Sequence, residues 1–292
     1  MYLLSFIVDI TVLVCQDHTK FINWQVQLFY KTFRKFYDYD FISLLYEDSK
    51  FEFEYPTFRT RMVRYFTPQA DLLQILDYPL VNRALQIKEY LNSTPPQDRY
   101  ILLCDADFLF CKHHEFKTNS LVSAQVTGYM DYKNVTSKNV IDFYKTYLNS
   151  KFEDTLYKPG GWPYLIKESF LRKIIQRWVD LIVLFRSHPL TPLRKTWWVD
   201  MYALNLAIAE TGEDIELFNI VSYPQDNNYS NPVIFHYCYP IKDKNENEIF
   251  NKYNLIYIER GKPFKVVIPP DIDSCSVNFL TTFNEFLDSG GS

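Results

Sequence analysis

The chain has 292 residues, of which 47% are hydrophobic and 23% charged, as in an ordinary globular protein with room for a large core. Its formal net charge of -4 excludes the broad basic surface of a protein that binds nucleic acid independently of sequence. With only 7 glycines, it is neither collagen-like nor a low-complexity chain.

Apolar runs and helical periodicities alternate along the first third of the chain. Residues 9–15 form an apolar run that predicts a buried strand. Residues 21–36 place apolar side chains three or four positions apart, which predicts an amphipathic helix. Short strands are expected at 41–46 and 62–66, and Pro79 then opens a second predicted helix.

Residues 100–104 form a compact apolar run, which predicts another buried strand. Strands and helices interleaved in this way predict an α/β fold with helices packed on a sheet. Because no repeat or flexible linker divides the chain, we expect one domain with two functional halves. The second half continues with a strand within 121–132, a turn at 158–163, helices over 170–185 and 199–210, and a strand at 233–237.

Cysteine usage and the first residues bear on the compartment. The five cysteines include no CxxC pair and are odd in number, which favours free thiols in a reducing environment. Residues 1–15 are apolar but contain Asp9 and lack a basic start, so they predict neither a signal peptide nor a membrane span. From these features alone we expect a cytoplasmic protein.

Two carboxylates, Asp105 and Asp107, follow the apolar run 100–104. Open α/β sheets bind ligands at the carboxyl ends of their strands. Two like charges at a desolvated strand end are costly unless a cation compensates them. Carboxylate oxygens suit Mg²⁺ or Mn²⁺, and such an ion would bridge to a diphosphate. The alternative is an acidic turn in which one carboxylate caps a backbone N–H.

A hydrophobic strand followed by D-x-D is also typical of aspartyl-phosphate hydrolases, in which the first aspartate is a nucleophile. That class usually carries the motif on its first strand, with Thr or Val after it. Here the motif lies a third of the way along the chain and precedes Phe108, and no Gly-Asp-x-x-x-Asp pattern follows. This class is therefore the second interpretation.

His236 lies near the end of the strand predicted at 233–237, and Lys242 follows it. A neutral imidazole is a ligand for Mn²⁺, and a lysine there would meet phosphate, so both residues fit a metal–diphosphate site. The alternative for His236 is a core histidine bonded to a backbone carbonyl.

Asp200 begins the helix predicted at 199–210, directly after Trp198 and Val199. The helix dipole alone favours an acidic residue in a first turn. The functional interpretation makes Asp200 the carboxylate that faces a reacting sugar, with Trp198 as an apolar wall. The two interpretations are compatible.

Two of the 7 glycines, Gly160 and Gly161, are adjacent in the sequence. They indicate a turn, or a backbone that approaches a ligand closely, with Trp162 as a stacking face for a sugar. Arg83, on the second predicted helix, is a candidate diphosphate contact or else a solvated helix residue. Asp17, just past the first strand, would bond a nucleoside or cap the following helix.

Several blocks together resemble the plant hydroxyproline O-arabinosyltransferases and the related peptidyl-serine α-galactosyltransferases. The first block is Cys15–Lys35, which is similar to the opening of that family, where a Trp-Gln pair precedes a Tyr-rich helix. The resemblance runs in the family's order over roughly residues 10 to 270. Its further blocks are Asn82-Arg83, Tyr100–Phe110, Gly160–Trp178, Trp198–Ala207 and Ile234–Tyr239.

The resemblance implies a GT-A fold, in which a mixed sheet flanked by helices binds a nucleotide sugar through a D-x-D metal site. Residues 1–115 would form the nucleotide-sugar-binding half and 116–285 the acceptor-binding half of the same domain, with a flexible tail at 286–292.

By position, Asp105 and Asp107 match the family's acidic motif, and His236 matches its C-terminal metal histidine. Asp200 matches an acidic position that is Glu in many relatives. The plant enzymes often read Glu-Pro-Asp where this chain reads Asp-Ala-Asp, a change that keeps the oxygen ligands. We also expect this chain to lack their N-terminal membrane anchor. The resemblance implies the Golgi lumen only if this chain is part of a longer one, and the acceptor is left open with the compartment.

We therefore expect a metal-dependent, retaining glycosyltransferase that uses a UDP-sugar, with arabinofuranose or galactose as the sugar. The acceptor would be a hydroxyl group such as that of peptidyl hydroxyproline or serine, and Mn²⁺ or Mg²⁺ the cofactor. The alternatives are a transferase acting on a small molecule or a hydroxylated nucleobase, an aspartyl-phosphate-type hydrolase, and a non-catalytic sugar-binding module. The acidic charge balance argues against nucleic acid as a partner.

Overall fold

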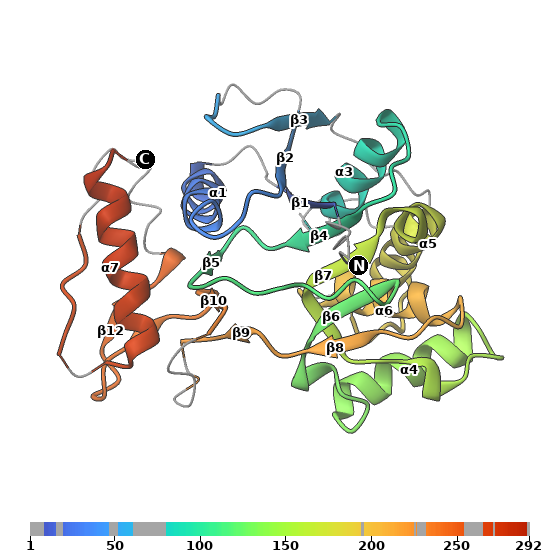
Figure 1. Ribbon diagram of the computed structural model, residues 1–292. Helices are drawn as coiled ribbons and strands as arrows, with labels where there is room; N and C mark the ends of the chain where they lie inside the picture. Colours follow the sequence, from blue (N-terminus) through green and yellow to red (C-terminus); the bar gives the residue numbers. More distant parts are fainter. Residues whose placement is uncertain are drawn as a thin grey trace, which may run out of the picture.

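A seven-stranded sheet with helices on both sides forms the centre of the molecule (Figure 1). The computed structural model describes residues 9–15, 20–46, 52–60, 80–193, 196–224, 226, 232–253, 265–270 and 272–290. The strand predicted at 62–66 and the positions of Asp17 and Pro79 lie outside these residues.

The main sheet has the strand order β3-β2-β1-β4-β7-β6-β8. Strands β1 to β4 are mutually parallel, whereas β7 is antiparallel to both of its neighbours, β4 and β6. The sheet is therefore mixed, and the predicted α/β class is confirmed. The strands are β1 (Ile10–Cys15), β2 (Asp40–Tyr46), β3 (Thr57–Thr60), β4 (Tyr100–Cys104), β6 (Val122–Val126), β7 (Gly160–Lys167) and β8 (Glu216–Phe218).

The two central parallel strands, β1 and β4, are buried along almost their whole length. Parallel strands with both faces covered are continuous apolar runs rather than alternating ones. This is why the runs at 9–15 and 100–104 were sufficient to predict both strands, and both predictions are confirmed.

Helix α1 lies on one side of β1 to β3, and α3 lies on the other with α5 and α6 beyond it (Figure 1). Helix α6 is buried on all sides, as expected of a helix that is apolar around its whole circumference. Every helix among the described residues is too short or too polar to span a bilayer. The helices are α1 (Lys20–Phe33), α3 (Leu80–Ser93), α4 (Val135–Tyr147), α5 (Glu168–Ser187), α6 (Val199–Ala209) and α7 (Ser274–Asp288).

A second, smaller core lies beside the main sheet. Strands β5 (Phe108–Phe110), β10 (Ile234–His236) and β9 (Val221–Ser222) form a three-stranded sheet, and β11 (Ile241–Lys242) pairs with β12 (Glu248–Phe250). Phe279 and Phe283 of α7 pack edge-on against Phe250 of β12. Because Phe286 is also buried in this core, the predicted tail 286–292 begins inside α7.

The turn predicted at 158–163 is wrong for residues 160–163, because strand β7 already begins at Gly160. A Cβ at Gly160 would lie 3.1 Å from the Ala124 Cβ atom, and one at Gly161 would overlap the Thr127 Oγ1 atom. These glycines are therefore required by the close approach of β7 to β6 and to the residue after β6. The strand predicted within 121–132 is likewise shorter than expected and ends at Val126.

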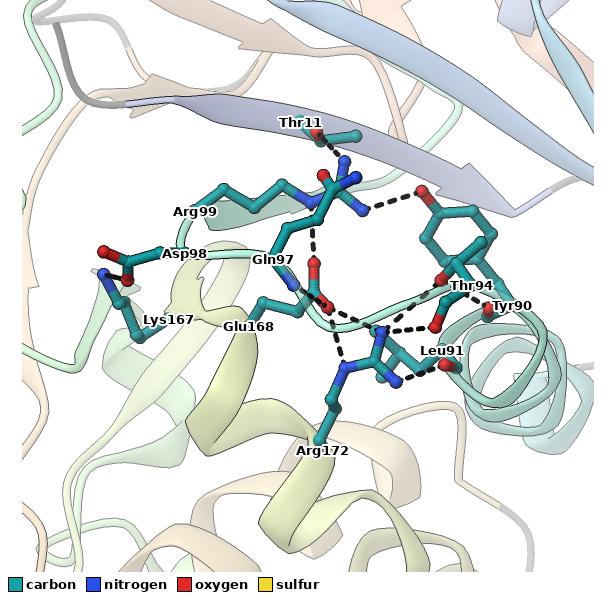
Figure 2. A network of polar contacts seen from close by, with 10 residues as sticks. All are labelled: Thr11, Tyr90, Leu91, Thr94, Gln97, Asp98, Arg99, Lys167, Glu168 and Arg172. Carbon is teal, nitrogen blue, oxygen red and sulfur yellow. Dashed lines mark hydrogen bonds and ion pairs between the residues drawn. The ribbon is translucent and has the colours of Figure 1, made fainter.

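A buried polar network holds the amino end of β4 (Figure 2). Glu168, the first residue of α5, accepts hydrogen bonds from Arg99 Nε at 2.6 Å and from Arg172 Nε at 2.7 Å. Arg99 also donates to Thr11 Oγ1 of β1 at 2.8 Å. The network joins β1, β4 and α5, and it therefore fixes the strand whose opposite end carries Asp105.

Candidate functional site

The Asp105-Ala106-Asp107 segment lies where the chain passes from the main sheet to the small one. It connects β4 of the first sheet with β5 of the second. Strand β5 pairs antiparallel with β10 in a register that sets His236 opposite Phe108. The backbone N–H of Tyr237 donates to the carbonyl oxygen of Asp107 at 3.2 Å. Main-chain pairing thus brings His236 beside the two carboxylates.

The three residues predicted to hold a metal ion lie together. His236 Nε2 is 3.2 Å from Asp107 Oδ1 and 4.0 Å from Asp105 Oδ2. One ligand atom from each residue falls within 4.8 Å of the other two, and the side chains are only 10% to 15% exposed. Two carboxylate oxygens and one imidazole nitrogen are a donor set that suits Mn²⁺.

Arg83, on α3, lies between two carboxylates. Its Nη2 donates to Asp105 Oδ1 at 2.5 Å, and its Nη1 donates to Asp200 Oδ2 at 3.0 Å. The guanidinium also lies over the ring of Trp162, with Cζ 4.4 Å from the ring centroid. The predicted diphosphate contact is therefore already engaged with two carboxylates. Trp162, predicted as a sugar-stacking face, supports Arg83.

Asp200 is almost fully buried, with 1% of its side chain exposed, in the first turn of α6. Burial raises its pKa to about 6; the positive charge of Arg83 opposes this shift, and the negative charge of Asp105 adds to it. Trp178 Nε1 on α5 donates to the backbone oxygen of Asp200 at 2.9 Å and so fixes the start of the helix. A carboxyl whose pKa is raised in a cavity is typical of a functional site.

Lys252 is a member of the site that sequence reasoning missed. It follows β12, is 11% exposed, and donates from Nζ to Asp107 Oδ2 at 2.5 Å. Burial alone would raise the pKa of Asp107, but Lys252 and His236 outweigh it and hold that pKa well below its usual range. Burial lowers the pKa of Lys252, and Asp107 more than reverses this, to about 12.

The pairing of these residues changes one premise of the sequence analysis. That analysis assigned the charge compensation of Asp105 and Asp107 to a bound cation. The structure shows that Arg83 and Lys252 already pair with the two carboxylates from within the chain. No local pattern could have linked Lys252 to Asp107, because the two residues are 145 positions apart.

Lys242, the lysine predicted to meet phosphate, lies at the surface on β11. Its Nζ is 2.9 Å from Glu246 Oε2, and its side chain is 47% exposed. It is not among the residues that line the cavity beside the acidic cluster. Gly160 and Gly161 do not line this cavity either, and their role in the structure is the close strand packing described above.

A cavity of about 330 Å³ opens beside the cluster, with Asp105, His236, Arg83 and Asp200 in its wall. Trp198, which was predicted to form an apolar wall, lines the cavity, and the centroid of its ring is 5.1 Å from that of Tyr129. Trp197 and Tyr239 line it too and are 63% and 47% exposed. The remaining lining residues are Val126, Thr127, Gly128, Trp162, Met201, Tyr223 and Cys238.

A comparison with known families identifies the family of this chain. The family model described as the hydroxyproline O-arabinosyltransferase family N-terminal domain matches residues 10–217. The match runs from β1 into β8, and it includes both carboxylates of the D-x-D segment and Asp200. The chain belongs to this family, as the sequence blocks indicated.

One relative is the protein named hydroxyproline O-arabinosyltransferase PLENTY from Lotus japonicus. It is 26% identical over 165 residues, which cover 56% of this chain and 45% of the relative. The match thus spans less than half of that relative's length.

Proposed function

We propose that this protein is a metal-dependent glycosyltransferase that moves a sugar from a UDP-sugar to a hydroxyl acceptor. The observation that carries the proposal is the convergence of Asp105, Asp107 and His236 at the end of β4, beside a cavity that also contains Asp200. Ligands of α/β sheets bind at such strand ends. Membership of the arabinosyltransferase family supports a transferase rather than an aspartyl-phosphate hydrolase.

Asp105, Asp107 and His236 would hold Mn²⁺ or Mg²⁺, and their donor atoms fit such an ion. When bound, the ion supplies a positive charge that stabilises the negative charge on the leaving diphosphate. The protein's own contribution is a partly buried cluster in which His236 is held by the β5–β10 ladder and Asp107 by a main-chain hydrogen bond from Tyr237, while Asp105 directly follows β4.

Asp200 would act on the sugar or the acceptor. Its carboxylate lies in the cavity wall and is held in position by Arg83, and because its pKa is about 6, it is mostly ionised at neutral pH. A carboxylate in this place would position the acceptor hydroxyl or stabilise an oxocarbenium-like centre. Both a front-face attack and a double displacement retain the anomeric configuration, and the geometry of Asp200 serves either route.

The acceptor would be a hydroxylated peptide, with hydroxyproline or serine as the residue that receives arabinofuranose or galactose. The name of the Lotus japonicus relative supports hydroxyproline as the acceptor residue and arabinose as the sugar. The partly exposed rings of Trp197 and Tyr239 at the cavity supply an aromatic surface. Aromatic grooves are a usual docking surface for proline-rich peptides.

The proposal is tested by measuring UDP release and peptide glycosylation with UDP-arabinofuranose and UDP-galactose, with and without EDTA. We expect turnover that EDTA abolishes and Mn²⁺ restores, and that Asp107→Ala eliminates. Asp142→Ala, which removes an exposed carboxylate on α4, serves as the control. Turnover that persists in EDTA would refute the metal site. UDP binding without transfer from any donor would favour a sugar-binding module.

A further inference from the structure

We propose that Lys252 weakens the binding of a divalent cation alone to the acidic cluster and so makes cation binding depend on the nucleotide diphosphate. The inference rests on the proposed function, because it assumes that the cluster of Asp105, Asp107 and His236 takes a cation and a diphosphate.

The first argument is the balance of charge in the cluster. Asp105, Asp107 and Asp200 contribute three negative charges, while Arg83 and Lys252 contribute two positive charges, which leaves a net charge of -1 when His236 is in the neutral form that ligates a metal. All five side chains are 15% exposed or less. A divalent cation entering alone loses its hydration shell in exchange for little net negative charge, so its affinity is low.

The second argument is geometric and concerns Asp107. Its two oxygens face different partners: Oδ1 lies 3.2 Å from His236 Nε2, and Oδ2 lies 2.5 Å from Lys252 Nζ. A cation that takes Asp107 as a ligand must therefore share this carboxylate with an ammonium group. The two positive charges repel each other across a partly buried space, where repulsion is stronger than in water.

A diphosphate removes this conflict because it brings the missing negative charge. Its oxygens would accept hydrogen bonds from the Lys252 ammonium, which has three donors, while they also ligate the cation. Lysine suits such an exchange since it is a compact charge on a flexible stem. Arg83 does not, because two carboxylates and the Trp162 ring fix its guanidinium.

Titration calorimetry of Mn²⁺ with and without saturating UDP tests the inference in the wild type and in Lys252→Met. Lys138→Met is a matched control, because Lys138 Nζ also lies 2.5 Å from an aspartate, Asp142, but on the exposed surface of α4. We expect UDP to tighten Mn²⁺ binding to the wild type by roughly tenfold or more, within the usual range of coupling between sites. By linkage, Mn²⁺ must tighten UDP binding by the same factor.

In Lys252→Met we expect Mn²⁺ alone to bind about tenfold tighter than in the wild type, with a smaller effect of UDP. Lys252→Arg should keep the wild-type coupling, and Lys138→Met should change neither quantity. Wild-type Mn²⁺ affinity that is the same with and without UDP would overturn the inference without any variant. So would a folded Lys252→Met that binds Mn²⁺ no tighter than the wild type.

Circular dichroism establishes whether Lys252→Met is folded. If it is not, Lys252→Gln replaces it, and equal wild-type Mn²⁺ affinities with and without UDP would still overturn the inference. Mn²⁺ and UDP that both bind without coupling contradict this inference and leave the proposed function standing. A wild-type protein that takes up neither Mn²⁺ nor UDP contradicts the proposed function and this inference with it.

Discussion

Arg83 Nη1 donates to Asp200 Oδ2 at 3.0 Å and thereby ties helix α3 to the first turn of α6. The same guanidinium pairs with Asp105, so the positive charge of Arg83 is shared by two carboxylates whose side chains are 15% exposed or less. Removal of the Arg83 side chain is costly, because it leaves the negative charges of Asp105 and Asp200 close together with little access to water.

We expect Arg83→Met to lower the free energy of unfolding by about 3 kcal/mol at pH 7. Urea unfolding followed by circular dichroism measures the change. Arg34→Met is the control, since Arg34 pairs at 3.7 Å with a fully exposed aspartate, Asp38, and should cause little change. A loss in Arg83→Met no larger than that in the control would show that the two carboxylates do not depend on this cation.

The raised pKa of Asp200 predicts a stability that falls with pH. The neutral form of Asp200 favours the folded state; this contribution is complete below its ordinary pKa of 3.8 and is lost as the pH rises through about 6. Asp200→Asn mimics the neutral form at every pH. Between pH 4 and pH 7, the unfolding free energy of the variant should gain about 2 kcal/mol relative to the wild type. A constant difference over this range would contradict the shift.

The network at the other end of β4 predicts the opposite pH dependence. Burial raises the pKa of Glu168, but the hydrogen bonds from Arg99 and Arg172 outweigh it and hold that pKa below its usual value of 4.5. Glu168 therefore stabilises the fold above pH 4.5, and this contribution is lost as the pH falls through the lowered pKa.

We expect Glu168→Gln to cost about 3 kcal/mol of unfolding free energy at pH 7, because it leaves the buried Arg99 and the partly buried Arg172 without their carboxylate. The cost should shrink on going below pH 4.5, as urea unfolding at a series of pH values would show. Glu216→Gln, which alters a more exposed glutamate on β8, provides the comparison. An equal cost at pH 3.5 and pH 7 would mean that Glu168 acts only through packing.

Close packing at the start of β7 yields a prediction with an internal control. Gly161→Ala would place a Cβ against Thr127, and we expect it to lower the unfolding free energy by about 2 kcal/mol. Gly128→Ala should be nearly neutral, because a Cβ there meets no atom within 4 Å. Adding Thr127→Ala should restore most of the loss in Gly161→Ala. Strictly additive effects of the two substitutions would contradict the proposed contact.

Local patterns predicted those parts of the site that follow directly from one element. Strand β4 was predicted at residues 100–104, because this apolar run ends directly before the charged residues Asp105 and Asp107. Asp200 was placed correctly in the first turn of a helix. Gly160 and Gly161 were misassigned to a turn, since the sequence does not show that a neighbouring strand requires their lack of a side chain.

The ion pairs of the site lay beyond such reasoning. Lys252 was missed and Lys242 was chosen in its place, although both are lysines near short strands of the second core. Which of the two reaches Asp107 depends on how β11 and β12 pack in the second core, where Phe250 contacts Tyr237 and α7, and that is a tertiary property. The aromatic residues Trp197 and Tyr239 were missed for the same reason, because nothing in their neighbourhood distinguishes a cavity wall from an ordinary surface.

The ladder between β5 and β10 makes the spacing of Asp107 and His236 a property of the main chain. Inserting or deleting a single residue between Asp107 and Phe110 would turn the following side chains to the other face of the small sheet. Asp107 and His236 would then be separated, although both residues were still present in the sequence. A change in the length of this segment would therefore take the cluster apart even with all its residues retained, whereas a substitution that keeps the β5–β10 pairing would leave the spacing of the donors unchanged.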